Sequence, residues 1–159
     1  MVLNLPKDIK FIITDFDGVI TDNCVYIDSK GEMTRKVNFK DIMAFYMLKK
    51  QGYKVGIISG EQNSAIDLIK EKLQIDEVHQ NIRVKLDVLN DILSEYDITR
   101  DDVVYVGDDM NDYEVLKYVK YPVTVPDAVG KIKDIEGIQI TSTKGGEGAF
   151  REIADAILG

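Results

Sequence analysis

The stretch that decides the fold reads Phe11-Ile12-Ile13-Thr14-Asp15-Phe16-Asp17-Gly18-Val19. Its first part is short, apolar and β-branched, which predicts a buried strand rather than a helix. In an open α/β sheet, ligands bind beyond the carboxyl ends of the strands, so two carboxylates emerge here where chemistry is usually done. Two neighbouring anions need a cation, and Mg²⁺, a hard ion with oxygen ligands, suits them. The stretch predicts metal-assisted phosphoryl chemistry with an aspartate as nucleophile.

Length and composition predict one globular domain that spans residues 1–159. The chain has 159 residues, of which 45% are hydrophobic and 30% are charged, as in ordinary soluble domains. We find no membrane-spanning stretch and no signal peptide. Cys24 is the single cysteine, so no internal disulfide is expected and a cytoplasmic location fits. The net charge of −8 argues against nucleic acid and anionic membranes as partners.

Strand-like and helix-like runs alternate along the chain, which predicts βα units and a doubly wound, mostly parallel α/β sheet. The predicted strands are 11–14, 55–58, 103–106 and 121–125, and the predicted helices are 41–51, 63–73, 86–96 and about 147–158. The segment 24–39 interrupts this alternation. Its two short extended runs flank Ser29-Lys30-Gly31-Glu32, a pattern typical of a β-hairpin. Because the hairpin directly follows the aspartate pair, we expect it to rise beside the site.

Chemistry-bearing residues occur in four segments that end a strand or begin a helix. These are 15–18, Ser59-Gly60, Lys85, and Gly107-Asp108-Asp109-Met110-Asn111-Asp112. Phosphoryl transfer needs a nucleophile, a cation, donors for the phosphate oxygens and an acid for the leaving group. We therefore expect Asp15 to attack, Asp17 to serve as acid and then base, and Ser59 and Lys85 to hold oxygens. Asp15, Asp17 and Asp108 are expected metal ligands, with Asp109 or Asp112 completing the site.

Each segment alone has an ordinary explanation. A lone Gly-Asp-Asp is commonly a solvated turn, a Ser-Gly step a capped turn, and a lysine a surface residue. Asp-x-Asp-Gly also begins calcium loops, but Val19-Ile20-Thr21 does not continue such a loop. With His79 as the one histidine, a zinc site is not expected. The order of the four segments favours an active site.

Two rival classes share parts of this pattern. A phospho-accepting receiver domain of a signalling protein also uses an acidic pair, a metal, a hydroxyl and a lysine. In a receiver, however, the phosphorylated aspartate follows a middle strand and the lysine comes last, whereas here the middle strand ends in Ser59. The second rival is a catalytically idle scaffold of the same fold, although none of the motifs is broken.

The segment 15–21, with Ser59, Lys85 and 107–109, resembles the haloacid dehalogenase superfamily of phosphatases. The hairpin and the segments 17–22, 107–112 and 145–152 resemble its 3-deoxy-D-manno-octulosonate 8-phosphate phosphatases and the related 2-keto-3-deoxynononate 9-phosphate phosphatases. The resemblance covers nearly the whole chain. It implies a Rossmann-like fold, Mg²⁺, a sugar acid phosphate substrate and a role in lipopolysaccharide biosynthesis. It also implies a homotetramer in which a neighbour's hairpin and carboxy-terminal segment close the site.

The spacing leaves no room for a cap domain, because only the hairpin and one helix separate Asp17 from Ser59, and one helix and a short strand separate Ser59 from Lys85. The resemblance further implies substrate-binding roles for Gly60, Glu61, Lys72, Gly146, Glu147 and Arg151. Glu61 resembles the nine-carbon branch. Ile69 and Lys40 stand where relatives carry arginines, so Arg151 and Lys144 are the candidate cations for a substrate carboxylate. A different small sugar phosphate is therefore the alternative substrate.

Overall fold

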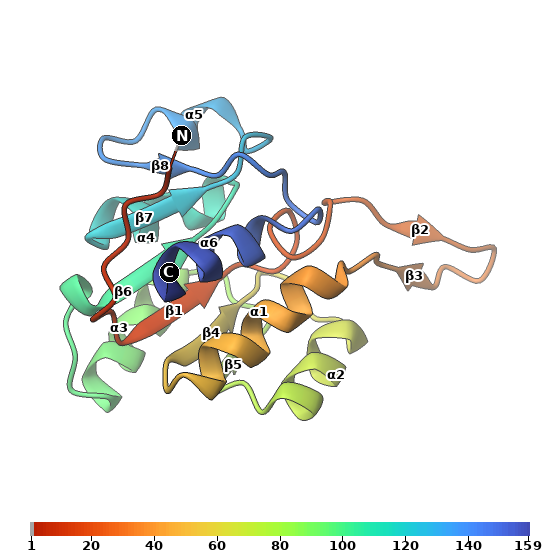
Figure 1. The fold of residues 1–159 in the computed structure, drawn as a ribbon. Helices are drawn as coiled ribbons and strands as arrows, with labels where there is room; N and C mark the ends of the chain where they lie inside the picture. The colour runs from red at the N-terminus through yellow and green to blue at the C-terminus, as the bar shows by residue number, and fades with distance from the viewer. Residues whose placement is uncertain (1) are drawn as a thin grey trace.

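A six-stranded, fully parallel sheet forms the centre of the structure, a computed structural model that describes residues 2–159 (Figure 1). Its order is β5-β4-β1-β6-β7-β8. The chain adds strands on one side of the central strand β1 and then on the other, so the order reverses at β1. In such a sheet the crevice at the reversal point is the usual ligand site. The strands are β1 (Phe11–Thr14), β4 (Lys54–Ile58), β5 (Glu77–His79), β6 (Val103–Val106), β7 (Tyr121–Thr124) and β8 (Gln139–Ile140).

Helices cover both faces of the sheet, as a parallel sheet requires. Successive residues of β1 alternate between two cores: Ile12 packs into one, and Phe11 and Ile13 pack into the other. The first core includes residues of α1 (Phe39–Lys50), α2 (Ser64–Leu73) and α6 (Ala149–Leu158), and the second includes residues of α3 (Lys85–Glu95) and α4 (Tyr113–Tyr118). The remaining elements are the short helix α5 (Gly130–Lys133) and the 3-10 turns η1 (Arg100–Asp102) and η2 (Met110–Asp112). Among the described helices, none is long and apolar enough to span a bilayer.

The helices α1 and α6 lie side by side on one face of the sheet (Figure 1). The rings of Phe45 and Phe150 pack between them with centroids 4.4 Å apart. Asp41, fully buried on α1, accepts a hydrogen bond of 3.0 Å from the backbone N–H of Arg151 in the first turn of α6. Since Gly148 at the N-cap of α6 has no side chain to offer, Asp41 supplies the cap from the neighbouring helix.

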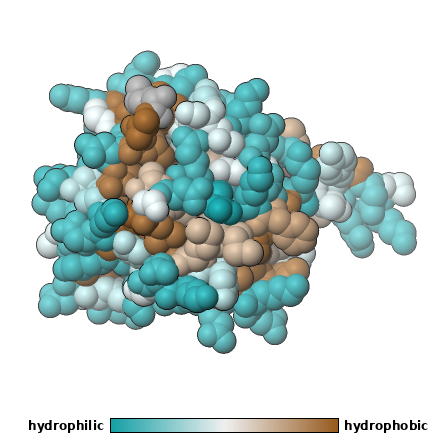
Figure 2. Space-filling model, in the orientation of Figure 1, coloured by the Kyte–Doolittle hydropathy of each residue, from teal (hydrophilic) through white to brown (hydrophobic). Residues whose placement is uncertain are grey.

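The hairpin projects away from the body of the molecule (Figure 1). It consists of β2 (Tyr26–Ile27) and β3 (Met33–Thr34), which pair antiparallel around Gly31, a residue with φ +80°. Its large apolar side chains are exposed, including Tyr26, Ile27 and Met33. Hydrophobic side chains also gather on the surface over α1 (Figure 2), where Phe39 is 87% exposed.

The predicted fold class is confirmed, including the hairpin, and residues 2–159 form no element besides those named above that could serve as a cap domain. The strands at 11–14 and 103–106 lie where the sequence predicts them, and the other two predicted strands differ by one residue at one end. The hairpin's paired strands are only two residues each, shorter than the predicted runs. The sequence analysis missed the two-residue strand β8 and the short helices α4 and α5, which have too few residues to show a period.

Candidate active site

A cleft of about 570 Å³ lies beyond the carboxyl ends of β1, β4 and β6. This volume suits a small-molecule ligand. The cleft brings together residues from all three strand-end loops and from the loop before α3. It is lined by Asp15, Asp17, Asn23, Val25, Ser59, Gly60, Glu61, Ile82, Arg83, Asp108, Asp109 and Asn111.

Asp15 directly follows β1 and is 5% exposed. Its Oδ1 accepts hydrogen bonds from the backbone N–H of Phe16 at 2.7 Å and from Nζ of Lys85 at 2.9 Å. Burial raises the pKa of the Asp15 carboxyl well above its usual range, and the negative charge of Asp112 adds to the rise, while Lys85 opposes it. A cation bound here favours the ionised, nucleophilic form.

Lys85, the first residue of α3, has a side chain with no exposed surface and lies between two carboxylates. Its Nζ donates to Asp15 and to Oδ1 of Asp112, each at 2.9 Å. Burial lowers the pKa of the Lys85 ammonium, but the two carboxylates outweigh burial and the net pKa is raised. Lys85 is therefore a fixed positive charge beside Asp15.

Asp112 is fully buried and receives hydrogen bonds on both carboxylate oxygens. Oδ1 accepts from Lys85 and from the hydroxyl of Tyr105 at 2.6 Å. Oδ2 accepts from the backbone N–H groups of Asp108 at 3.0 Å and Asp109 at 3.4 Å. A carboxylate accepts about four such bonds in all. Asp112 therefore uses its acceptor capacity to position the loop and Lys85.

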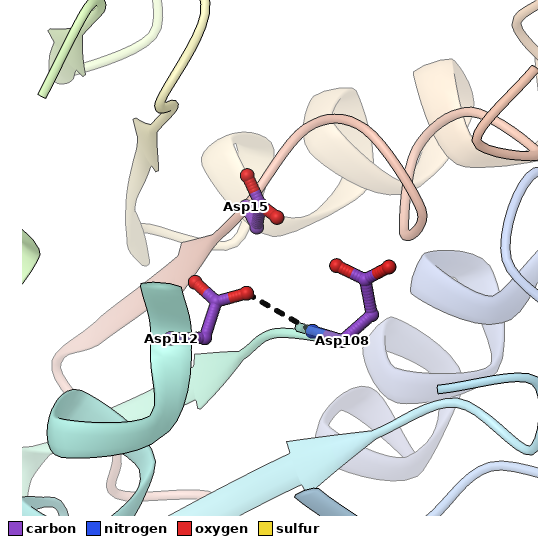
Figure 3. Close-up of side chains that lie close together, drawn as sticks. All are labelled: Asp15, Asp108 and Asp112. Carbon is purple, nitrogen blue, oxygen red and sulfur yellow. Dashed lines mark hydrogen bonds between the residues drawn. The ribbon is translucent and has the colours of Figure 1, made fainter. Parts of the chain in front are cut away.

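The residues fit a divalent cation between Asp15 and Asp108. Asp15, Asp108 and Asp112 each offer an oxygen within 4.8 Å of the others, and Figure 3 shows the three side chains converging. Oδ1 of Asp108 is buried and has no hydrogen-bond partner among the described residues. Burial and the charge of Asp112 raise the pKa of Asp108 to about 7. An unpartnered carboxylate oxygen beside other acids is a ligand set for a hard cation.

Gly18 makes room for this arrangement. Its φ of +90° disfavours any side chain, and a Cβ at this position would lie 1.8 Å from Oδ2 of Asp108. Asp-x-Asp-Gly thus ends in glycine because the loop after β1 approaches the Asp108 carboxylate closely.

Asp17 also lines the cleft. Its Oδ1 accepts from Nε of Arg35 at 2.9 Å and from the hydroxyl of Thr21 at 3.1 Å. Arg35 follows β3, so the hairpin strand places a cation on the predicted acid and base. Asp109 also lines the cleft, exposed, and its Oδ1 accepts from the N–H of Met110.

The loop after β4 carries the other predicted side chains. Ser59 is 1% exposed, and its hydroxyl oxygen accepts from the N–H of Glu61 at 3.2 Å. Glu61 is exposed at the cleft. A Cβ on Gly60 would lie 3.0 Å from Nδ2 of Asn111, so this glycine lets the loops after β4 and β6 approach.

Four predicted substrate-binding residues lie outside this cleft. Lys72 lines a separate apolar groove beside α1 and α2. Gly146 is buried, and its N–H donates to the carbonyl of Val19 at 2.9 Å. Glu147 and Arg151 line another pocket, and Arg151 pairs with Asp155 at 2.9 Å. Within one chain the structure does not bring these four to Asp15.

Sequence reasoning assigned no role to Asn111 and missed four other residues of the cleft, namely Asn23, Val25, Ile82 and Arg83, as well as Arg35 beside Asp17. Arg35 lies in the hairpin segment 24–39, which the sequence already places beside the aspartate pair. A basic residue in that segment is the sequence signal that could have identified it. Arg83 precedes Lys85 by two residues, and this closeness to a predicted site residue could have identified it.

Comparisons with known proteins agree with this geometry. Residues 77–153, which include Lys85 and Asp108, match the haloacid dehalogenase-like hydrolase family. The chain is 30% identical over 157 residues to the 3-deoxy-D-manno-octulosonate 8-phosphate phosphatase of Yersinia pestis, covering 99% of this chain and 83% of that protein.

Solved structures show the same fold. A putative haloacid dehalogenase family hydrolase from Streptomyces avermitilis has a TM-score of 0.92 and 36% identity, covering 99% of this chain and 90% of that one. The octulosonate 8-phosphate phosphatase of Moraxella catarrhalis, solved with magnesium, phosphate and KDO, has a TM-score of 0.90 and 28% identity, covering 96% of this chain and 87% of that one. The chain therefore belongs to the haloacid dehalogenase superfamily and is a phosphatase related to the octulosonate 8-phosphate phosphatases.

Proposed function

We propose that this chain hydrolyses the phosphate ester of a 2-keto-3-deoxy sugar acid, either octulosonate 8-phosphate or nonulosonate 9-phosphate, with Mg²⁺ as its metal. The observation that carries this proposal is the buried Lys85–Asp15 ion pair beside the unpartnered Asp108 oxygen, inside a cleft of small-molecule size. The metal-bound and KDO-bound relative supports both the ion and the substrate class.

Asp15 is the proposed nucleophile. Both of its hydrogen-bond donors bind Oδ1, which leaves Oδ2 to attack phosphorus. An Asp15 oxygen–phosphorus bond forms as the bond from phosphorus to the sugar oxygen breaks, and Asp17 gives its proton to that oxygen. Lys85 and Ser59 hold phosphate oxygens. Asp15 and Asp108, with Asp17 and Asp109 nearby, would hold the metal, which would neutralise charge on the phosphate oxygens.

Water then hydrolyses the aspartyl-phosphate. Asp17, now ionised, takes a proton from the water as the water oxygen bonds to phosphorus and the bond from phosphorus to the Asp15 oxygen breaks, which frees phosphate, restores the Asp15 carboxylate and returns Asp17 to its protonated form. Arg35 and Thr21 orient Asp17 for both proton transfers.

The test is a phosphate-release assay with the two sugar acid phosphates, simpler sugar phosphates and added Mg²⁺. We expect wild-type turnover that chelation of the metal abolishes. Asp15→Asn should lower kcat by at least about 1,000-fold while its circular dichroism and thermal unfolding stay close to the wild type. Substantial turnover by a folded Asp15→Asn protein would refute the role of Asp15.

A different small sugar phosphate is the second candidate substrate. The observation in its favour is that Arg151, a candidate cation for the substrate carboxylate, is paired with Asp155 away from the cleft. The receiver alternative is not retained, because β4 ends in Ser59 and the chain belongs to a phosphatase family.

Residues 1–159 are proposed to act as one cytoplasmic domain in lipopolysaccharide synthesis, assembled as a homotetramer. Exposed apolar side chains on the hairpin and on α1 support assembly, as does the placement of Glu147 and Arg151 outside their own chain's cleft. In a tetramer these residues act on a neighbour's cleft. Light scattering that shows a monomer at assay concentration would refute this arrangement.

A further inference from the structure

The charge of the cleft is strongly unbalanced. Five carboxylates line it, from Asp15, Asp17, Glu61, Asp108 and Asp109, and Arg83 is the only lysine or arginine among the lining residues that the structure describes. A divalent cation between Asp15 and Asp108 offsets only part of this charge. A substrate that carries a second anion besides its phosphate therefore needs a further positive group.

Four of the basic side chains described above are either paired with carboxylates or lie outside the cleft. Arg35 pairs with Asp17 at 2.9 Å, and Lys85 is shared between Asp15 and Asp112. Arg151 pairs with Asp155, and Lys72 lines the separate apolar groove. By contrast, Arg83 is exposed and has no carboxylate within 4.0 Å among residues 2–159. Its guanidinium is free to bind a ligand.

The loop that carries Arg83 is held against the Ser59 loop. The N–H of Ile82 donates to the carbonyl of Ser59 at 3.0 Å, and the N–H of Asn81 donates to the carbonyl of Glu61 at 3.3 Å. Lys85, two residues further on, is buried at the nucleophile. Arg83 therefore starts from a backbone that is fixed on both sides, which lowers the entropic cost of binding.

We propose that Arg83 is the specificity-determining residue that binds the non-transferred carboxylate of the substrate. The phosphate has Lys85, Ser59 and the metal, so Arg83 is left for the second anion. A planar guanidinium pairs with a carboxylate through two parallel N–H···O bonds. This inference rests on the proposed function.

The test compares two substrates that differ only in that carboxylate. One is whichever sugar acid phosphate the wild type hydrolyses faster, and the other is its primary carboxamide; p-nitrophenyl phosphate is a third probe. Arg83→Ala should lower kcat/KM for the acid by about 10-fold or more, mainly through KM, and change it less than about 3-fold for the amide and the nitrophenyl ester. Arg83→Lys should recover part of the loss.

Arg100→Ala is the matched control, since Arg100 is an exposed arginine in the turn before β6, on the amino-terminal side of the sheet, and its removal changes the net charge equally. It should leave all three rates unchanged. Equal losses on acid and amide, or no loss on either, would overturn the role of Arg83. So would a wild type that hydrolyses the acid and its amide equally well, although the phosphatase proposal would stand. A wild type that releases phosphate from none of the probes with Mg²⁺ would instead refute the proposed function.

Discussion

The strand-end loops and the carboxy-terminal segment both hold charged residues, but they are built differently. Around Asp15, charges are buried and bonded to one another, with Asp112 bound to Lys85, Tyr105 and two backbone N–H groups. In the carboxy-terminal segment, the backbone is fixed while the side chains of Glu147 and Arg151 reach a different pocket. The chain thus contains all the groups of the proposed catalytic site, whereas recognition of the rest of the substrate is open to residues such as Arg83 or to a neighbouring subunit.

The strongest test of this contrast removes the buried cation. Lys85→Met leaves Asp15 and Asp112 buried without their shared partner, so we expect about a 1,000-fold loss of kcat and a loss of roughly 3–5 kcal/mol in the free energy of unfolding. Denaturant unfolding and phosphate release measure the two effects. Lys120→Met is the control, because its exposed pair with Asp101 at 3.8 Å contributes about 1 kcal/mol at most. Equal effects of the two variants would contradict the contrast.

A smaller effect is expected from crowding the metal ligands. Gly18→Ala would press its Cβ on Asp108 and should weaken activation by Mg²⁺ about 100-fold. Gly137→Ala is a matched control, because Gly137 has φ +80° and no atom within 4 Å of its would-be Cβ. Both substitutions strain the backbone and should lower the melting temperature, but only the first should change the Mg²⁺ concentration that gives half-maximal activity. If both variants changed this Mg²⁺ concentration equally, backbone strain alone would be responsible.

The pH dependence of metal binding tests whether the buried acids of the strand-end loops hold the cation. Because the pKa of Asp108 is about 7 in the metal-free chain, the metal must displace a proton below pH 7. We expect Mg²⁺ affinity, measured by calorimetry, to rise by about 10-fold between pH 6 and pH 8, since the ionised fraction of Asp108 rises by that factor. Affinity that is flat across this range would mean that Asp108 is not a ligand.

A further prediction concerns the cap between α1 and α6, away from the cleft. Burial raises the pKa of Asp41 to about 6 in the folded protein, against backbone hydrogen bonds that lower it. The folded state therefore holds the proton more tightly, and this contribution to stability is complete below about pH 4 and is lost as pH rises through 6. The unfolding free energy of the wild type minus that of Asp41→Asn should fall by roughly 2 kcal/mol from pH 4 to pH 7. A pH-independent difference would contradict this assignment.

The sequence predicts most of the fold because β1 and β6 are continuous apolar runs that end in acidic loops. It also predicts that residues 15, 59, 85 and 108 lie close together, since strand ends meet at one edge of a parallel sheet. Residues 15, 59 and 108 line the cleft, and Lys85 is bonded to Asp15. It could not predict the partners of Asp112, which depend on how η2 turns back toward α3. It could not place Glu147 and Arg151 either, because their direction follows from how α6 docks on α1.

Reductive trapping during turnover tests the central claim most directly. Enzyme that is mixed with substrate and Mg²⁺, quenched and treated with borohydride should carry a reduced aspartyl group, and peptide mass spectrometry should place it at Asp15. The same treatment without substrate should leave Asp15 unmodified. Turnover without any trapped modification at Asp15, or with the label at Asp108 or Asp17, would contradict the account.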